Sequence, residues 1–332
     1  TPVIATKNGQ KVLYAGTGCG NIVCMRASDG APLWRFQLSR GGVNASVLLN
    51  EGNIIAIHGK ENLDSSQTGR MVALKEPQTF SGTPHAVLGK KDEVWRNIAG
   101  HFTSSGVLVE GRIYQMLPTG ELVAIDAKSG RTLWTKKLGS EQLHASPLYA
   151  DQKLYIPLRD GKVFVLKPHA TGAELLSETQ LDGNCLGAPA AFGGQVFIHT
   201  TKALYAFGNP TNPTPPPRAQ PLPKEHGVAV ALRVIPAEIA LQPETPMKLE
   251  VWEVDAHGTP LRRVAPEQIT LASSPTPDSN ISLTQTGEIT AKPKTPPQAR
   301  VLKITAGKLW GTVRVRVLSA LPYVVDFEKA SL

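Results

Sequence analysis

A unit of about 40 residues recurs along residues 1–208, and this repeat constrains the fold more than any other feature of the chain. Its clearest copy, Arg112 to Trp134, reads as two strands joined by a turn at Thr119-Gly120. A second turn at 127–130 leads into a third strand that ends in Trp134. Another short apolar segment, 105–109, precedes this copy. The unit is therefore four short strands with tight turns between them.

Five copies of this unit align with one another, which predicts an all-β fold of the β-propeller class. They cover residues 2–34, 46–95, 105–134, 146–176 and 188–207. The fifth copy lacks its outer strand. We therefore predict about five blades here, in a propeller that is incomplete at its N-terminus and belongs to a ring of about seven or eight blades. A β-sandwich with regular Gly and Trp spacing is the alternative, and five aligned copies argue against it.

Large aromatic residues end the outer strand of three copies, and a glycine stands four residues before two of them. A chain that must reverse before its outer strand favours glycine in the turn, and a large apolar side chain after the turn can pack between blades. We interpret these positions as structural contacts that dock one blade on the next. The residues assigned to blade docking are Trp34, Trp95, Asp126, Gly130 and Trp134.

The segment Ala124-x-Asp126-x-x-x-Gly130-x-x-x-Trp134 resembles the docking motif of pyrroloquinoline-quinone-type (PQQ-like) propeller repeats. The resemblance covers residues 1–208 and implies a PQQ-like propeller. It implies little about a cofactor, because the motif is a packing motif and most proteins that carry it bind no quinone. Departures from the motif are Ser129 for the usual Thr, and Leu176 for Trp in the fourth copy.

The composition changes after residue 208. Residues 209–225 are Pro-rich and predict a semi-rigid, extended linker. Residues 226–319 alternate in the manner of short strands, which predicts a β-sandwich. Segments 233–241, 287–291 and 313–317 resemble bacterial immunoglobulin-like modules, with Trp252 and Trp310 expected in the core. Residues 320–332 are expected to lead into a further β-domain.

Charge and cysteine content exclude several classes of function. The formal net charge is +8, but Lys and Arg are dispersed, so a nucleic-acid groove is not expected and anionic partners are only weakly favoured. The three cysteines are too few for a disulfide framework, so we expect them to be unpaired. A bond between Cys19 and Cys24, which flank a hairpin turn, is the alternative and would leave Cys185 free. The sequence contains no apolar stretch of about 18 residues, so we expect no membrane-spanning helix. Thr1 is not an initiator, so we expect a processed or excised product.

A quinone-dependent dehydrogenase is the enzyme class that the resemblance suggests. Such enzymes hold calcium through a carboxylate and an amide, and use an Asp base and an Arg near the quinone. The residues expected at the channel mouth are Asn44, Thr103, His144 and Leu186, with no carboxylate among them. Asn44, Thr103 and His144 are candidate contacts for a small polar ligand, and a solvated or backbone-bonded role is the alternative. We therefore predict no cofactor, and keep PQQ with calcium as the alternative.

No other catalytic motif is present, so the sequence favours a binding protein over an enzyme. The insertions 59–68 and 76–91 in the second copy are candidate binding loops, since loops on a rigid scaffold often carry function. We expect a periplasmic or extracellular bacterial scaffold that binds a protein partner or a glycan, similar to the propeller lipoproteins of outer-membrane assembly. A quinoprotein dehydrogenase and a carbohydrate-binding surface protein are the alternatives. An exposed aromatic platform would favour the last.

Overall fold

The computed structural model describes residues 2–7, 10–27, 30–77, 86–101, 103–140, 144–209, 227–256, 258–272 and 280–319. The chain forms two compact units, one of residues 1–7 and 11–219 and the other of residues 8–10 and 220–332. Both are built from strands, as the sequence predicts. The described helical segments are two short 3₁₀ turns, η1 (Lys90–Asp92) and η2 (Pro266–Gln268). The predicted linker after Asn209 and the predicted tail 320–332 lie outside the described residues.

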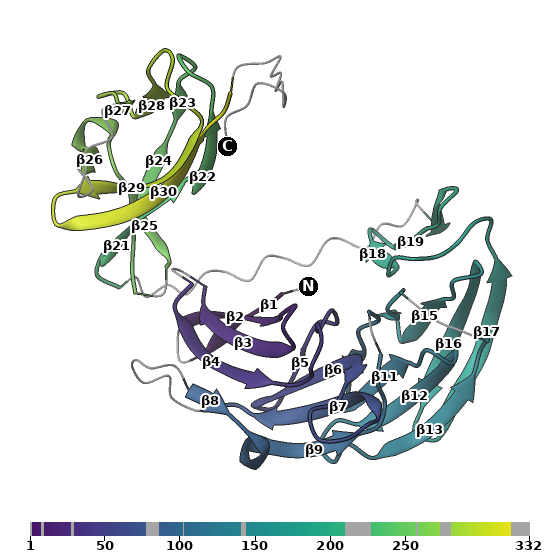
Figure 1. Ribbon diagram of the computed structural model, residues 1–332. Coiled ribbons are helices and arrows are strands. Elements are labelled where there is room, and N and C mark those ends of the chain that lie inside the picture. Colours follow the sequence, from purple (N-terminus) through teal and green to yellow (C-terminus); the bar gives the residue numbers. More distant parts are fainter. Residues whose placement is uncertain are drawn as a thin grey trace, which may run out of the picture. The chain divides into compact units, whose positions relative to one another are not determined.

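The first unit contains five sheets that follow the five sequence copies (Figure 1). The first four strands in chain order are β1 (Val3–Lys7), β2 (Gln10–Gly16), β3 (Asn21–Arg26) and β4 (Pro32–Gln37). The second sheet has β5 (Leu48–Asn50), β6 (Asn53–Glu61), β7 (Thr68–Lys75) and β9 (Glu93–Asn97), and the third has β10 (Val107–Val109), β11 (Arg112–Met116), β12 (Glu121–Asp126) and β13 (Thr132–Lys137). The fourth has β14 (Leu148–Ala150), β15 (Lys153–Pro157), β16 (Lys162–His169) and β17 (Gly172–Gln180), and the fifth has β18 (Ala190–Phe192), β19 (Gln195–His199) and β20 (Leu204–Gly208). Each sheet is one blade.

One strand departs from this simple order. The insertion after β7 of the second blade contains β8 (Ala86–Leu88), which pairs in parallel with β4 of the first blade. The sequence predicted a long loop here. The segment forms a strand because the outer edge of β4 offers free backbone groups, and Phe36 of β4 aligns with Leu88 of β8. The first blade thus has five strands, and the insertion ties two blades together.

Successive blades are held together by shared clusters of buried side chains. Trp34 of the first blade and Leu74 of the second belong to one cluster, and Trp95 of the second and Ile113 of the third belong to the next. Two further clusters join the third blade to the fourth and the fourth to the fifth. Full burial of each large apolar side chain stabilises the fold by roughly 1.5–3 kcal/mol. Within the described ranges, no such cluster joins the fifth blade to the first, and the larger ring stays a prediction.

The second unit packs three small sheets around one core. They are β21 (Ala231–Ile235), β24 (Glu250–Val254) and β25 (Pro260–Arg263); β22 (Glu238–Leu241), β30 (Leu309–Val317), β29 (Gln298–Ala306) and β26 (Thr270–Ala272); and β23 (Met247–Lys248), β28 (Glu288–Ala291) and β27 (Ile281–Leu283). The core takes alternate residues of these strands, such as Val313, Val315 and Val317 of β30. Its likeness to an immunoglobulin-like module stays a prediction.

The expectation that Trp310 lies in the core is wrong, because its side chain is 53% exposed. Residues of β30 alternate between buried and exposed, and Trp310 is out of phase with the buried Val313, Val315 and Val317. Trp252 is half-buried. Cys19 and Cys24 are unpaired, since Cys19 is exposed whereas Cys24 is buried in the first blade. In the part of the chain that the structure describes, no helix has the length and apolarity of a membrane span.

Candidate functional site

The turn between β12 and β13 is built around Asp126. The backbone N–H and the hydroxyl of Ser129 both donate to Asp126 Oδ1 at 2.7 Å. These hydrogen bonds, that of the hydroxyl foremost, hold the pKa of the Asp126 carboxyl below its usual range. Gly130 follows in the left-handed region with φ 73°, where a side chain is unfavourable. Asp126 and Gly130 therefore shape a turn that can receive the neighbouring blade.

Trp95 of the second blade lies on this turn of the third blade. Its Nε1 donates to the Ala127 carbonyl at 3.1 Å, and Asn97 Nδ2 donates to the Gly130 carbonyl at 2.7 Å. Trp134 repeats the arrangement one blade further on, where its Nε1 donates to the His169 carbonyl at 3.3 Å. Each indole thus joins two blades through both its apolar ring and its N–H.

Trp34 differs from the other two tryptophans. It is buried and its ring centroid lies 6.0 Å from that of Tyr14 in the same blade. Its Nε1 has no hydrogen-bond partner among the described residues. The second blade carries the insertion 76–91 at the turn that the third and fourth blades offer to Trp95 and Trp134. Trp34, Trp95, Gly130 and Trp134 thus lie where two blades meet, and Trp34 is the most deeply buried of the three tryptophans. The Asp126 carboxylate instead accepts hydrogen bonds within its own turn.

The predicted channel-mouth residues precede the first strands of their blades, and a ladder of serines connects these segments. The backbone N–H of Ser46 donates to Ser105 Oγ at 2.8 Å, and the N–H of Ser105 donates to Ser146 Oγ at 2.8 Å. Thr103 Oγ1 and His144 Nδ1 lie 3.2 Å apart. Asn44 occupies the equivalent place on the second blade with an exposed side chain. The structure therefore brings Thr103 and His144 together.

These residues do not fit a calcium–quinone site. Asn44, Thr103, His144 and Leu186 supply no carboxylate, whereas calcium in proteins takes mainly carboxylate and carbonyl oxygens. Across the described ranges, no three His, Cys, Asp or Glu side chains are grouped to hold a metal ion. The ladder of serines instead satisfies backbone N–H groups, which is a structural role.

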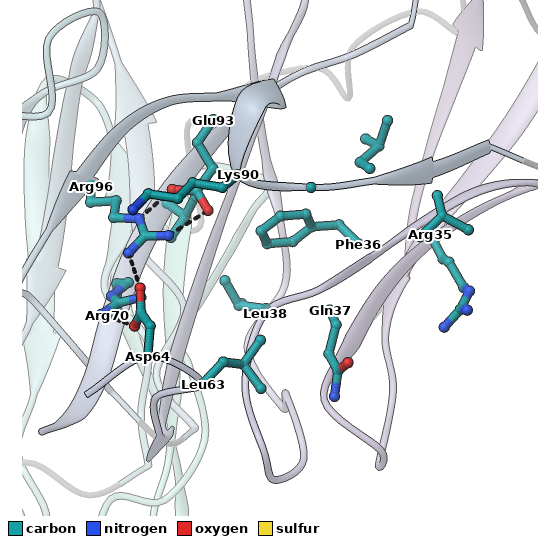
Figure 2. Close-up of a pocket in the computed structure, with 14 residues that line it drawn as sticks. Arg35, Phe36, Gln37, Leu38, Leu63, Asp64, Arg70, Lys90, Glu93 and Arg96 are labelled. Carbon is teal, nitrogen blue, oxygen red and sulfur yellow. Dashed lines mark hydrogen bonds and ion pairs between the residues drawn. The ribbon is translucent and has the colours of Figure 1, made fainter. Parts of the chain in front are cut away.

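A cavity of about 380 Å³ lies between the first two blades and is the strongest candidate for a binding site (Figure 2). It is bounded by β4, β7, β8, η1 and β9 and by the loop at 63–64. Both insertions noted in the sequence meet here, since Leu63 and Asp64 come from the first and Val87 to Lys90 come from the second. The apolar lining residues are Phe36, Leu38, Leu63, Val72, Val87 and Leu88. We call this cavity the blade 1–2 groove.

One wall of the groove is a network of four charged side chains. Asp64 pairs with Arg70 at 2.8 Å and also with Arg96, which in turn donates to Glu93 at 2.7 Å (Figure 2). Hydrogen bonds from Arg70 and then Arg96 hold the pKa of the Asp64 carboxyl far below its usual range. The two carboxylates and two guanidinium groups balance each other in charge. Arg35 and Lys90, also in the lining and exposed, give the groove a net positive charge.

The sequence alone pointed to the two insertions but not to the groove. Neither insertion is distinctive by itself, and the groove exists only because β8 pairs with the preceding blade. The one visible signal was that both insertions fall in the second copy of the repeat. This places them on neighbouring loops of one blade.

The blades, their order and their docking turns define the class of the first unit as a β-propeller of PQQ-like repeats. A family model described as "Outer membrane protein assembly factor BamB" matches residues 3–75 and 86–175. The gap in this match falls on the insertion that precedes β8. The family match therefore covers most of the first four blades, and it includes β8 and the residues of the second insertion that line the groove.

A curated relative and three solved structures give the remaining comparisons. The outer membrane protein assembly factor BamB of Yersinia pestis is 21% identical over 194 residues, which are 56% of this chain and 46% of that protein. The chain thus spans about half the length of this relative. The structure of BamB from Moraxella catarrhalis gives a TM-score of 0.46 at 17% identity, covering 86% of this chain and 83% of that one. A chain of the mitotic checkpoint complex gives a TM-score of 0.45 at 10% identity, covering 62% of each chain. The computationally designed Ika4 protein gives a TM-score of 0.41 at 9% identity, covering 53% of this chain and 96% of that one.

Proposed function

We propose that this chain is a non-catalytic binding scaffold whose blade 1–2 groove receives an extended segment of a partner protein. The observation that carries the proposal is the groove itself, a cavity of about 380 Å³ with six apolar lining residues and a net positive charge. It lies between the outer parts of two blades and away from the serine ladder. Binding sites of this kind combine apolar contact with a few placed polar groups.

The lining specifies the chemistry of the partner segment. Leu63 and Val87 are exposed apolar side chains, with Val87 62% exposed, so the groove offers apolar surface that a partner can bury. Arg35 and Lys90 add positive charge that the Asp64–Arg96 network does not neutralise. A segment with apolar side chains beside Asp or Glu fits both features. A basic segment would meet like charge.

The matched relatives supply the setting for this proposal. The matched family and the curated relative are described as outer membrane protein assembly factors. We therefore propose a periplasmic or extracellular location and a partner among the proteins of the cell envelope. The carboxylate-free channel mouth supports a binding role rather than quinone chemistry.

Selection from a library of displayed 12-residue peptides tests the groove. Peptides enriched on the purified full chain should combine apolar residues with Asp or Glu. Their Kd, measured by fluorescence anisotropy, should rise at least about tenfold in the Arg35→Glu/Lys90→Glu variant, which is 1.4 kcal/mol. The control Lys75→Glu/Lys167→Glu makes the same charge change at exposed lysines of the second and fourth blades. Equal effects of the two variants, or enrichment of basic peptides, would refute the proposal.

A further inference from the structure

The outer face of one sheet in the second unit carries an unusual set of side chains. This sheet has the order β22-β30-β29-β26, and its inner face supplies Val313, Val315 and Ile304 to the core. The opposite face is exposed. Its side chains are Glu238 and Ala240 of β22, Trp310, Thr312, Arg314 and Arg316 of β30, Val301, Lys303 and Thr305 of β29, and Thr270 of β26. We call this surface the Trp310 face.

Trp310 is the aromatic centre of this face. Its side chain is 53% exposed, whereas tryptophan on a sheet is usually buried against a second layer. The Nζ atom of Lys303 lies 4.7 Å from the ring centroid, which is a cation–π contact between neighbouring strands. An exposed indole beside an ammonium group offers one flat apolar surface and one positive charge at the same point.

The rest of the face is positively charged. Arg316 pairs with Glu238 at 2.7 Å, and Arg314 lies 3.9 Å from the same carboxylate. Two guanidinium groups thus share one carboxylate, and Lys303 adds a third cation. Ion pairs this exposed contribute little to stability, so an incoming anion can compete for them at small cost. The named charges sum to a net positive surface with only one acidic side chain.

The arrangement is also linear. Trp310, Thr312, Arg314 and Arg316 alternate along β30, and at about 3.4 Å per residue the row extends about 20 Å. Hydroxyl groups lie beside it, with Thr270 Oγ1 and Thr305 Oγ1 2.6 Å apart on the neighbouring strands. The row therefore presents, in order, an aromatic ring, a hydroxyl and two guanidinium groups.

We propose that the Trp310 face binds an anionic polysaccharide along β30. The apolar face of a sugar ring can stack on the indole, whose π face attracts the weakly positive C–H groups of the sugar. Carboxylate or sulfate groups further along the polymer can pair with Arg314 and Arg316, and guanidinium suits both anions because it donates in a planar fork. The threonine hydroxyls can bond sugar hydroxyls. A regular polymer matches a regular row better than a folded protein surface does.

An anionic lipid surface is the competing occupant, and the geometry favours it less. Membrane-bound aromatic residues insert into the headgroup boundary from loops or from amphipathic helices. Trp310 instead stands on a sheet, with the ammonium group of Lys303 near its ring. A linear polymer can lie along such a sheet.

Isothermal titration of the full chain with polygalacturonate, dextran sulfate and neutral dextran tests the proposal. We expect binding to one or both anionic polymers and none to dextran, with weaker binding at higher salt. Trp310→Ala should weaken binding at least tenfold, whereas Trp310→Phe should keep most of it because the ring remains. Arg314→Ala/Arg316→Ala should also weaken binding at least tenfold. Both sites are exposed, so these variants are expected to fold.

Arg262→Ala/Arg263→Ala is the matched control. These two arginines are exposed on β25 of the same unit and pair with Glu253 and Glu250. The control removes the same charge from a different sheet and should leave binding unchanged. Equal loss in the two arginine variants would show that net charge alone attracts the polymer and would overturn the proposal. So would full binding by Trp310→Ala, absence of binding to both anionic polymers, or binding only to vesicles that contain phosphatidylglycerol.

Discussion

The indole ring of Trp95 lies so close to Gly130 that a Cβ atom at residue 130 would come within 2.4 Å of the ring. The two residues belong to adjacent blades, and Trp95 Nε1 also donates to the Ala127 carbonyl of the same turn. The contact explains why a glycine is required at this turn of the third blade. Gly130 is needed both for its positive φ and for the space that the neighbouring indole occupies.

Replacement of Gly130 by alanine should therefore destabilise the first unit by more than the cost of placing alanine in a left-handed backbone conformation. Gly111 is a matched control, since its φ is also 73° and a Cβ there would meet nothing within 4 Å. Gly111→Ala should cost about 1–2 kcal/mol of unfolding free energy for the left-handed backbone. Gly130→Ala should cost about 1–3 kcal/mol more, because the ring or the turn must move. Denaturant titration of both variants measures this difference, and equal costs would contradict it.

Glu76 should anchor the start of the second insertion. Its carboxylate is 2% exposed, accepts a hydrogen bond from the Tyr14 hydroxyl and pairs with Lys7 at 2.6 Å. Glu76→Ala leaves two polar groups of the first blade without this partner, so we expect a loss of about 3 kcal/mol or more in unfolding free energy. Asp151→Ala removes an exposed partner of Lys153 and should cost less than about 1 kcal/mol. Similar losses in the two variants would show that the Glu76 network is not structural.

The stability of the first unit should fall as the pH falls from about 6.5 to about 4. Burial, followed by the nearby Arg70, lowers the pKa of His58 to about 4 from its usual value of 6.5. Between these values the unfolded chain binds a proton that the folded chain does not, so acidification favours unfolding. If the whole pKa shift of His58 applies, the unfolding free energy falls by about 3 kcal/mol over this pH range.

Denaturant titrations at pH 7, 6, 5 and 4 measure this dependence. His58→Gln should flatten the pH slope whatever its own effect on stability at pH 7. The same substitution at the exposed His199 is the matched control. An unchanged slope in His58→Gln would contradict the assignment to this imidazole.

Local patterns in the sequence carry most of the fold. Turn glycines, strand alternation and the repeated Gly–Trp spacing lie within one copy of the unit, so they predict the blades and a docking role for Gly130 and Trp134. The pairing of β8 with β4 is different, because three residues with ordinary strand propensity join a strand about 50 residues earlier in the chain. Their destination depends on the free edge of β4, which no local pattern reveals.

The exposure of Trp310 was available in the sequence and was missed. Val313, Val315 and Val317 have the period of a strand with one buried face, and Trp310 is out of phase with them. The size of tryptophan suggested a core position, whereas the alternation of the strand placed it outside. The groove was not predictable in this way, since it requires two insertions and a long-range strand pairing at once.

Photo-cross-linking at Val87 most directly tests whether the blade 1–2 groove is a protein-binding site. A benzophenone amino acid replaces Val87 in the full chain, expressed in its source cells, and the same group at the exposed Ile98 of the second blade is the control. We predict one discrete protein adduct at Val87 that is absent at Ile98 and is lost when Arg35→Glu/Lys90→Glu is added. No adduct at Val87, or the same adducts at both positions and in the charge-reversed variant, would contradict a binding role for the groove.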